Sequence, residues 1–447
     1  MPRSRSSRGR VHIVLIPGFA GFDALGQLEY YAGVTPRFQQ WRHSRRGRSR
    51  NDVALHYFDN FPTAAVRTRA ARLRKYLTTR IARGEFAEND SLALVGHSTG
   101  GLDIRWLLRE LDQSRDQRFP VDGATAGDAV VQAEDILQYI DKLVFLSVPQ
   151  WGTNIADWVR SYQLGRELVV AELRAAVGAS QVPLLDGLQQ WIVDSAAGAT
   201  NIGLVLAIRD ALSEAEAGVG CNPMCVALSQ EAASELQLWL RHIATDFHAI
   251  DDLAAGDRAE DPQSPAHFDQ ATRDEERAQW KRDKIQTRSY ATIGARPFYF
   301  AFGKAAPRWD LINPLSYPDL TQRANPVPET DIVYRACYRA CAGGPFVPHH
   351  GDVAPKPITG KATDRDIEVW DNDGIVNTAS MMWPDGGKTV LVDGDHMDIV
   401  GHYKPVKAAS KCSQREYQAY DLLKSGSKFD DTRFAQVWNS VFDFCAT

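Results

Sequence analysis

One serine of this sequence stands in a setting that could make it a nucleophile. The Gly-x-Ser-x-Gly pattern of a nucleophile elbow, a tight turn between a buried strand and a helix, occurs at residues 96–100. The apolar run at 91–96 predicts the strand, and apolar positions at helical spacing within 102–111 predict the helix. Glycine at both ends of the pattern leaves room for so tight a turn. Because strand, turn and helix occur together, the pattern indicates that Ser98 is a nucleophile and disfavours a chance match.

A serine hydroxyl needs a base that accepts its proton and donors that stabilise the oxyanion formed by its attack. The backbone N–H of Thr99, directly after the serine, can be one donor. The second is expected from the loop after the first strand, where Pro-Gly-Phe-Ala-Gly-Phe occupies residues 17–22. We predict an oxyanion hole formed by the amides of Phe19 and Thr99. The alternative for 17–22 is an ordinary glycine turn.

An acid and a histidine follow the serine in the order that such a site requires. Asp-Asn-Asp-Gly occupies residues 371–374, and Asp373 is preferred over Asp371 as the acid because it directly precedes the glycine. His396 lies in the loop after an apolar run at 388–392, which predicts the final strand. A histidine there can act as the base, and the acid can orient its imidazole.

Three other histidines are weaker candidates for the base. His349 and His350 precede the candidate acids and follow no predicted strand. His97 is adjacent to the serine and cannot fold back onto it, so it is expected to pack beside the site.

The candidate residues lie in a chain with the rhythm of a parallel sheet covered by helices. Nearly continuous apolar runs predict buried strands, and residues 63–83 show helical spacing. After Pro149 the pattern becomes helical, ending in a polar segment at 256–284 that is expected to be loop and exposed helix. We predict an α/β-hydrolase fold, a mostly parallel central sheet with helices on both faces and an inserted helical cap. The strands are expected at 11–16, 53–58, 91–96, 143–148, 288–293 and 388–392, with a hydrolase core formed by residues 1–150 and 286–447 and a cap or lid at 151–285.

Composition limits the partners of the chain. Of its 447 residues 44% are hydrophobic and 24% charged, and the formal net charge of −5 gives no reason to expect nucleic acid. The basic runs at 3–10 and 42–50 are expected to be a solvated tail and loop, or else a surface for transient contact with anionic lipid. No apolar stretch approaches the roughly 20 residues of a membrane span. No signal peptide is visible, so the default location is cytoplasmic, or secreted if a signal was removed.

The six cysteines permit two interpretations. Pairing Cys221 with Cys225, Cys337 with Cys341 and Cys412 with Cys445 would give three disulfides and imply export. Six buried thiols would fit a cytosolic protein equally well. Neither close pair has the spacing of a zinc knuckle, so no structural zinc is predicted.

Taken together, these motifs resemble a bacterial lipase, and most closely the thermophilic bacillary and staphylococcal true-lipase family of the α/β-hydrolase superfamily. The resemblance implies hydrolysis of acylglycerols and simple esters beneath a helical lid. It assigns Ser98, Asp373 and His396 to a catalytic triad and Phe19 and Thr99 to the oxyanion hole, in agreement with the residues themselves. The matching segments are Pro-Gly-Phe-Ala-Gly-Phe at 17–22, Gly-His-Ser-Thr-Gly-Gly at 96–101, Asn-Asp-Gly-Ile-Val-Asn-Thr-Ala-Ser-Met at 372–381 and Asp-His-Met-Asp-Ile-Val-Gly at 395–401.

The metal sites of that family carry over only partially. Its calcium site uses an acid two residues after the catalytic histidine, which Asp398 matches, and an aspartate further along, where this chain has Tyr403. Its zinc ligands find no clear match here. We therefore expect that the reaction requires no cofactor, and calcium at Asp398 is the one metal to be tested.

Three functions remain open from sequence. The first is a lipase or carboxylesterase in which water resolves an acyl-enzyme on Ser98. The second is an acyltransferase with the same triad, in which an alcohol or amine replaces water. The third is a catalytically silent hydrolase fold used as an interaction module, which the complete set of catalytic residue types disfavours.

Overall fold

The computed structural model of the chain describes the segments that carry the predicted core. They are residues 9–21, 24–25, 28–44, 52–121, 130–161, 248–254, 270–296, 332–342, 356–357, 371–384, 389–404, 421–423 and 425–447, with single positions at 234, 235, 238, 242, 246 and 367. Most of the predicted cap lies outside these residues, so its boundaries and its lid role stay predictions. His349 and His350 lie outside them too.

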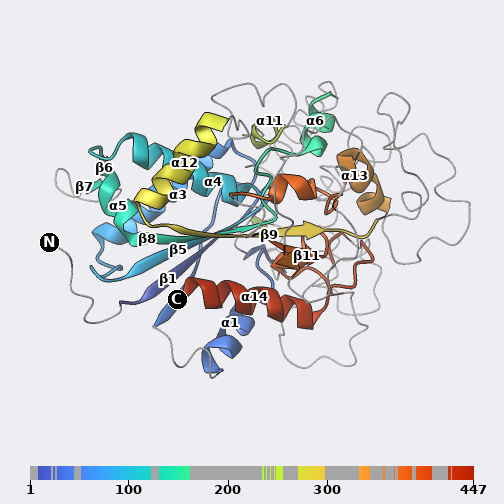
Figure 1. Cartoon of the computed structure of the whole chain (residues 1–447), viewed down its shortest axis with the longest axis horizontal. Helices are drawn as coiled ribbons and strands as arrows, with labels where there is room; N and C mark the ends of the chain where they lie inside the picture. The colour runs from blue at the N-terminus through green and yellow to red at the C-terminus, as the bar shows by residue number, and fades with distance from the viewer. Residues whose placement is uncertain are drawn as a thin grey trace, which may run out of the picture.

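A seven-stranded sheet forms the centre of the molecule (Figure 1). Every pair of neighbouring strands in it is parallel. This confirms the predicted α/β-hydrolase fold, with the strand before Ser98 in the interior of the sheet. In spatial order the strands are β10 (Lys356–Pro357), β11 (Thr389–Asp393), β9 (Gln286–Ile293), β8 (Ile140–Leu146), β5 (Ser91–His97), β1 (Val11–Ile16) and β4 (Val53–Tyr57).

The continuous apolar runs have a direct cause in this arrangement. β1 is buried along its whole length, and β5 and β8 are buried at all but one position each. Strands covered by helices on both faces have no side that can be polar. The six strands predicted from the sequence are therefore confirmed, with ends that differ by at most three residues.

Helices cover both faces of the sheet (Figure 1). On one face lie α3 (Val66–Ala82), α4 (Thr99–Gln113), α5 (Ala133–Tyr139) and α12 (Gln270–Arg282), and on the other α1 (Val34–His43) and α14 (Asp431–Cys445). In α3 the buried positions Val66, Ala70, Leu73 and Leu77 recur every three or four residues, which is the helical spacing seen in the sequence.

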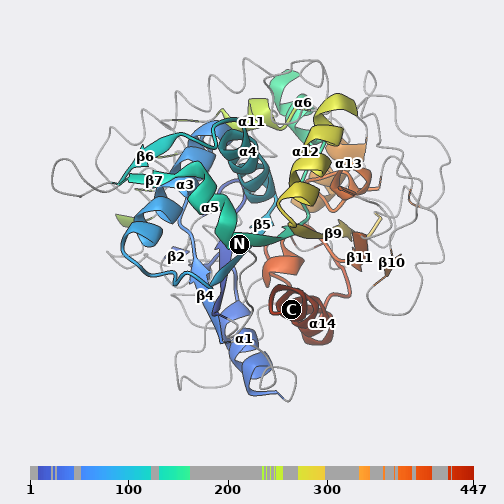
Figure 2. The same cartoon turned by 60° about the vertical axis from the view of Figure 1, so that its left-hand side comes forward.

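The prediction of an exposed helix within 256–284 is wrong for one side of α12. Trp280 is buried, and the Gln279 side chain donates a hydrogen bond of 2.9 Å to the Leu108 carbonyl in α4. Glu276 forms a buried ion pair with Arg105 of α4 at 2.8 Å. Figure 2 shows α12 beside α4 on the same side of the sheet. The many charged residues of this segment concealed its buried face, because long side chains on the other faces dominate its composition.

Shorter elements connect these layers. Two two-stranded antiparallel sheets pair β2 (Ala24–Leu25) with β3 (Leu28–Glu29) and β6 (Arg118–Pro120) with β7 (Val130–Gln132). The remaining helices are α6 (Asn154–Ser161), α11 (Ala249–Asp252) and α13 (Ile332–Ala342), with 3₁₀ turns η7 (Thr378–Met381) and η9 (Asp398–Val400). α6 packs on both α13 and α11.

The cysteines that the structure describes are thiols. Cys337, Cys341 and Cys445 are buried and form no disulfide, so the possible pairs Cys337–Cys341 and Cys412–Cys445 are not formed. The first pair lies one turn apart in α13, where side chains four residues apart have Cβ atoms about 5–6 Å from each other. A disulfide needs about 3.5–4.5 Å. The other three cysteines lie outside the described residues.

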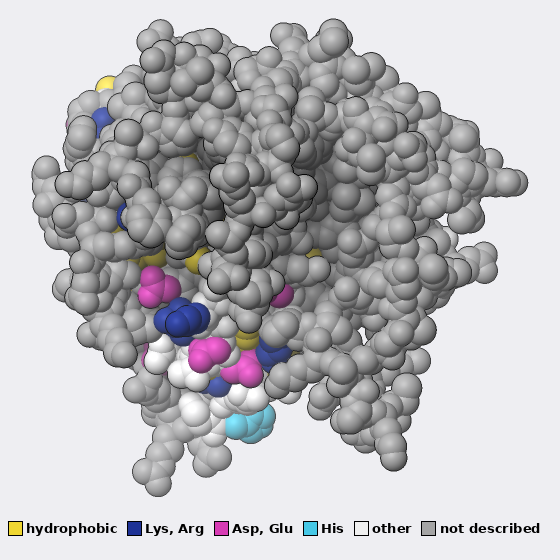
Figure 3. Space-filling model, turned by 90° about the vertical axis from the view of Figure 1, so that its right-hand side faces the viewer, with side chains coloured by type: hydrophobic (Ala, Val, Ile, Leu, Met, Phe, Trp, Pro, Cys, Tyr) yellow, Lys and Arg dark blue, Asp and Glu magenta, His cyan; other side chains and the backbone are white. Residues whose placement is uncertain are grey.

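The described surface has charges of both signs. In the face shown in Figure 3, acidic and basic side chains lie next to one another. Arg10 and Arg42, at the ends of the two basic runs, both pair with Asp52. The rest of each run lies mostly outside the described residues, so lipid contact stays a prediction. None of the helices that the structure describes is long and apolar enough to cross a membrane.

Candidate active site

Ser98 occupies the turn between β5 and α4 in a conformation that few residues adopt. Its φ is +52° and its ψ is −130°, and its side chain is buried. Such a positive φ in a residue with a Cβ stores strain, and the surrounding structure must hold it in place. The two glycines of the pattern provide the space. A Cβ on Gly96 would lie 2.5 Å from the Gly101 nitrogen, and one on Gly100 would collide with the Ile16 carbonyl oxygen.

The parallel sheet brings the other predicted residues to the same edge as Ser98. The loop 17–21 follows β1, and His396 follows β11. Asp373 lies beside the end of β9, where the Gly294 amide donates to the Asn372 carbonyl at 2.9 Å. Because the carboxyl ends of parallel strands meet at one edge, loops that are far apart in the sequence converge there.

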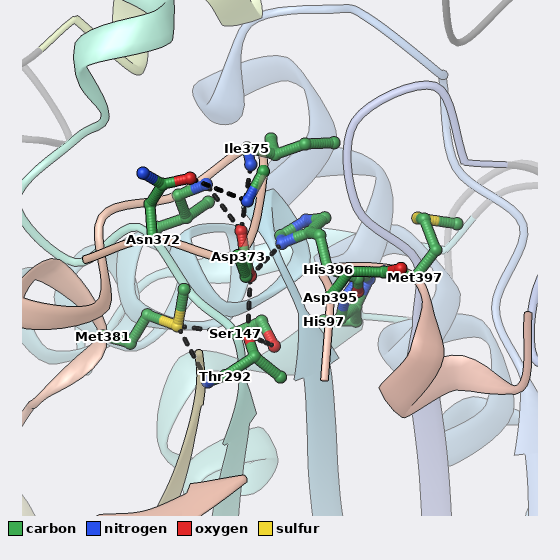
Figure 4. A network of polar contacts seen from close by, with 12 residues as sticks. His97, Ser147, Thr292, Asn372, Asp373, Ile375, Met381, Asp395, His396 and Met397 are labelled. Carbon is green, nitrogen blue, oxygen red and sulfur yellow. Dashed lines mark hydrogen bonds and ion pairs between the residues drawn. The ribbon is translucent and has the colours of Figure 1, made fainter. Parts of the chain in front are cut away.

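Asp373 and His396 form a buried pair (Figure 4). The Asp373 carboxylate accepts a hydrogen bond of 2.7 Å from His396 Nδ1, and neither side chain is more than 3% exposed. The His396 amide also donates to the Asp373 carbonyl at 3.0 Å. A neutral His396 that donates from Nδ1 has its lone pair on Nε2, which is the tautomer a general base needs.

Asp373 is held by four donors in all (Figure 4). Its Oδ1 accepts from the amides of Ile375 at 3.0 Å and Val376 at 2.8 Å. Its Oδ2 accepts from the Thr292 hydroxyl at 2.6 Å as well as from His396. A buried carboxylate needs such partners, because an unpaired charge away from water is very costly.

Thr292 and Ser147 extend this network, and neither was predicted from the sequence. Thr292 gives its single hydroxyl proton to Asp373, so the contact of 2.8 Å between Ser147 Oγ and Thr292 Oγ1 has Ser147 as donor. Ser147 has a φ of +50°. The only signal in the sequence is that both residues are polar at the ends of predicted apolar strands.

Asp371, the rival acid, belongs to another interaction. Its carboxylate accepts two hydrogen bonds from the Arg296 guanidinium, at 2.8 and 2.7 Å. The structure therefore brings Asp373 and not Asp371 to His396.

The loop 17–21 packs directly on Ser98. A Cβ on Gly18 would lie 2.5 Å from the Ser98 Cβ, so only glycine fits there. The Gly21 amide donates to the Gly18 carbonyl at 3.0 Å, and the Ala20 amide donates to the Pro62 carbonyl at 2.7 Å. Thr99 is the first residue of α4, where amides point out of the helix end. Phe19 and Thr99 thus flank the nucleophile, and their oxyanion role stays a prediction.

A buried ion pair is hydrogen-bonded to the loop at 17–21. Arg69 is fully buried and donates to the Pro17 carbonyl at 2.7 Å, while its Nε donates to Asp103 at 3.0 Å. Burial raises the pKa of Asp103 to about 6, against the opposing effect of Arg69. Arg69 stands on the apolar side of α3, and no local pattern in the sequence indicates a structural arginine there.

No hydrogen bond joins the side chains of Ser98 and His396, both of which the structure describes. His97 links the two loops instead, since its Nε2 contacts the His396 carbonyl at 3.0 Å and the two imidazole centroids are 4.6 Å apart. In free hydrolases the contact between nucleophile and base is often long and shortens when substrate binds.

Three carboxylates lie close together beside the loop that holds His396. Oxygen atoms of Asp395, Asp398 and Asp421 all lie within 4.8 Å of one another. Burial, followed by the charges of Asp421 and Asp373, raises the pKa of Asp398 to about 8. Burial and the neighbouring Asp398 and Asp421 raise the pKa of Asp395 well above its usual value.

This donor set fits a calcium ion, which prefers carboxylate oxygens. The sequence indicates Asp398 as a ligand, with Tyr403 expected to interrupt the site. The Tyr403 hydroxyl instead donates to Asp431 at 2.6 Å. Asp395 and Asp421 supply the further acids, and Asp421 was missed because it is remote in the sequence and has no motif.

Comparisons with known proteins give distant structural similarities. No family model matches the chain, and no curated protein matches it. Among solved structures, EstA from Clostridium botulinum is 14% identical, with 90% of this chain and 85% of that one covered and a TM-score of 0.37. Lipase 1 from Pelosinus fermentans is 17% identical, with coverages of 88% and 94% and a TM-score of 0.40. The metagenomic carboxyl esterase MGS0156 is 13% identical, with coverages of 98% and 76% and a TM-score of 0.36. The resemblance to the bacillary and staphylococcal lipases is not confirmed by these similarities.

The acidic cluster leads to a prediction about stability. A carboxyl whose pKa is raised on folding stabilises the protein most below its unfolded pKa, near 4, and loses that contribution as pH rises through its folded pKa. With a chelator, the melting temperature should therefore fall between about pH 5 and pH 8.5. Millimolar calcium should restore several degrees at the upper end of that range, because the cation replaces the lost protons.

Thermal unfolding of Asp398→Asn and of the control Asp393→Asn tests this prediction. Asp393 is half-buried and lies outside the cluster. The calcium effect should disappear in Asp398→Asn and persist in Asp393→Asn. An equal response to calcium in both variants would remove Asp398 from the site.

Proposed function

We propose that the chain is a serine hydrolase that cleaves carboxylic esters through an acyl-enzyme on Ser98. The observation that carries this proposal is the buried Asp373–His396 pair at the sheet edge that also holds the strained Ser98. A carboxylate that orients the histidine, a base with its lone pair on Nε2 and a serine on an elbow are the components that acyl transfer requires.

The proposed reaction has two halves. His396 Nε2 takes the proton of Ser98 as its oxygen attacks the ester carbonyl, and the amides of Phe19 and Thr99 stabilise the oxyanion. The intermediate collapses to the acyl-enzyme, and the alcohol leaves with the proton from His396. Water, activated by the same histidine, then releases the acid. Asp373 stays ionised throughout and stabilises the imidazolium.

Within this class we favour a lipase or carboxylesterase. An acyltransferase with the same residues differs only in the acceptor of the acyl group, so it is the second candidate. A silent module is disfavoured because the buried acid, the histidine that it orients and the strained serine are all present at the same end of the sheet. Contact with a lipid interface and the cellular location of the chain also remain proposals.

No cofactor is needed for these steps. A calcium ion held by Asp395, Asp398 and Asp421 would fix the loop that begins just before His396 and so would position the base. Its effect on the reaction would be indirect, through the geometry of that loop.

Ester turnover tests the proposal. The chain should hydrolyse p-nitrophenyl esters, and Ser98→Ala should fold normally with kcat lower by about 10³-fold or more. A rate that rises from acetate to palmitate, with a jump once the substrate aggregates, indicates a lipase. A maximum at acetate or butyrate indicates a carboxylesterase.

Product analysis with an added alcohol separates hydrolysis from acyl transfer. Free acid as the main product supports the hydrolase, and a new ester supports the transferase. Full activity of Ser98→Ala, or no turnover of any ester by the wild type, would overturn the proposal.

The Thr292 hydroxyl, which donates a hydrogen bond to Asp373, gives a further prediction. Thr292→Val removes one donor to the carboxylate with little change in shape, and a hydrogen bond to a charged group contributes about 1.5–3 kcal/mol. We expect kcat/KM to fall about tenfold or more. The control is Thr78→Val, which removes an equally buried hydroxyl that bonds only to the Lys75 carbonyl in α3. Equal kinetic effects of the two substitutions would show that the contact with Asp373 does not matter to turnover.

A further inference from the structure

A buried series of hydrogen bonds joins the loop at 17–21 to the loop that holds His396. The loop at 17–21 contains Phe19 and is called the oxyanion loop below. The Gly18 amide donates to the Tyr30 hydroxyl at 2.9 Å. That hydroxyl lies 2.6 Å from His97 Nδ1, and His97 Nε2 lies 3.0 Å from the His396 carbonyl oxygen. Tyr30 is 3% exposed and His97 is fully buried.

The chemistry of these groups fixes the direction of every hydrogen bond. A carbonyl oxygen only accepts, so His97 Nε2 carries the proton. Burial, followed by the charge of His396, lowers the pKa of His97 well below its usual value, so His97 is neutral. His97 Nδ1 must then accept the hydroxyl proton of Tyr30, whose oxygen accepts the Gly18 N–H. Each hydrogen atom therefore has one position, and this series of hydrogen bonds has a single donor–acceptor arrangement.

The backbone of Tyr30 is also tied to the segment that follows the base. His402 Nε2 lies 3.0 Å from the Tyr30 carbonyl oxygen, and His402 is fully buried. Tyr30 thus contacts the oxyanion loop through its hydroxyl and the segment after His396 through its carbonyl.

We propose that Tyr30 and His97 are positioning residues that hold the oxyanion loop and His396 at a fixed separation around Ser98. The proposal rests on the proposed function and names two residues that it does not include. Neither residue touches the reacting atoms. They act through Gly18, which precedes Phe19, and through the backbone of His396.

This arrangement suits the reaction in two ways. The oxyanion amide and the base must both lie correctly around one carbonyl, and displacements of about 1 Å can cost about 100-fold in rate. A neutral His97 also places no second positive charge beside His396, whose imidazole becomes positive during the reaction.

Tyr30→Phe is the direct test, because it removes one hydroxyl and leaves the ring. The matched control is Tyr290→Phe, since Tyr290 is fully buried and its hydroxyl donates to Ser440 in α14 at 2.9 Å. Active sites are titrated with a fluorophosphonate, and kcat is expressed per titrated site. A loss that reflects only misfolding lowers the number of sites and leaves kcat per site unchanged.

We expect kcat per site to fall about 10- to 100-fold in Tyr30→Phe, with KM changed less than about twofold. The inhibition constant of an alkylboronic acid, which mimics the tetrahedral state, should rise in parallel with the loss of kcat/KM. In Tyr290→Phe all three values should stay within about twofold of the wild type. Unchanged kcat per site in Tyr30→Phe, or equal effects in the two variants, would overturn the proposal.

A second pair of variants tests His97 itself. His97→Gln can keep one donor and one acceptor, whereas His97→Phe keeps neither, so His97→Gln should have the higher kcat per site. Equal values would contradict the proposal. A wild type that neither turns over esters nor reacts with the fluorophosphonate refutes the proposed function, whereas an active wild type with an unaffected Tyr30→Phe refutes this inference alone.

Discussion

The buried carboxylate of Asp373 is the constraint on which the site depends. It has no exposure to water and accepts hydrogen bonds from two amides of its own turn, from Thr292 at the end of β9 and from His396 after β11. Any strand register that separated Thr292 from this turn would remove one of the four donors to the buried carboxylate, at a cost of about 1.5–3 kcal/mol. The order of the strands, the turn that contains Asp373 and the orientation of His396 therefore depend on one another.

Buried polar groups with hydrogen-bond partners also hold the other loops at the carboxyl ends of the strands. Arg69 and Asp103 form a buried pair that holds the Pro17 carbonyl, and Tyr30 and His97 connect Gly18 with His396. Buried polar groups that are fully paired specify a single arrangement, because any other arrangement leaves a donor or acceptor without a partner. The strained Ser98 is thus surrounded by loops that each have little freedom.

The sequence was informative wherever function follows from local pattern. The six strands follow from the requirement that a strand covered on both faces be apolar, and the elbow follows from glycine spacing. Thr292, Ser147, Tyr30, Arg69 and Asp421 could not be predicted, since each acts through a contact with a residue remote in the sequence. The buried side of α12 was missed, and the choice between disulfides and buried thiols for Cys337 and Cys341 stayed open, because composition and spacing do not report which face of a helix is covered or which thiols pair.

Covalent labelling of the nucleophile tests the central claim most directly. The chain is treated with a fluorophosphonate, and the modified peptide is identified by mass spectrometry. The account predicts one adduct per chain, located on Ser98, which forms far more slowly in His396→Ala because the base is gone. An adduct on another residue, or labelling of Ser98 at the same rate without His396, would contradict the assignment of nucleophile and base.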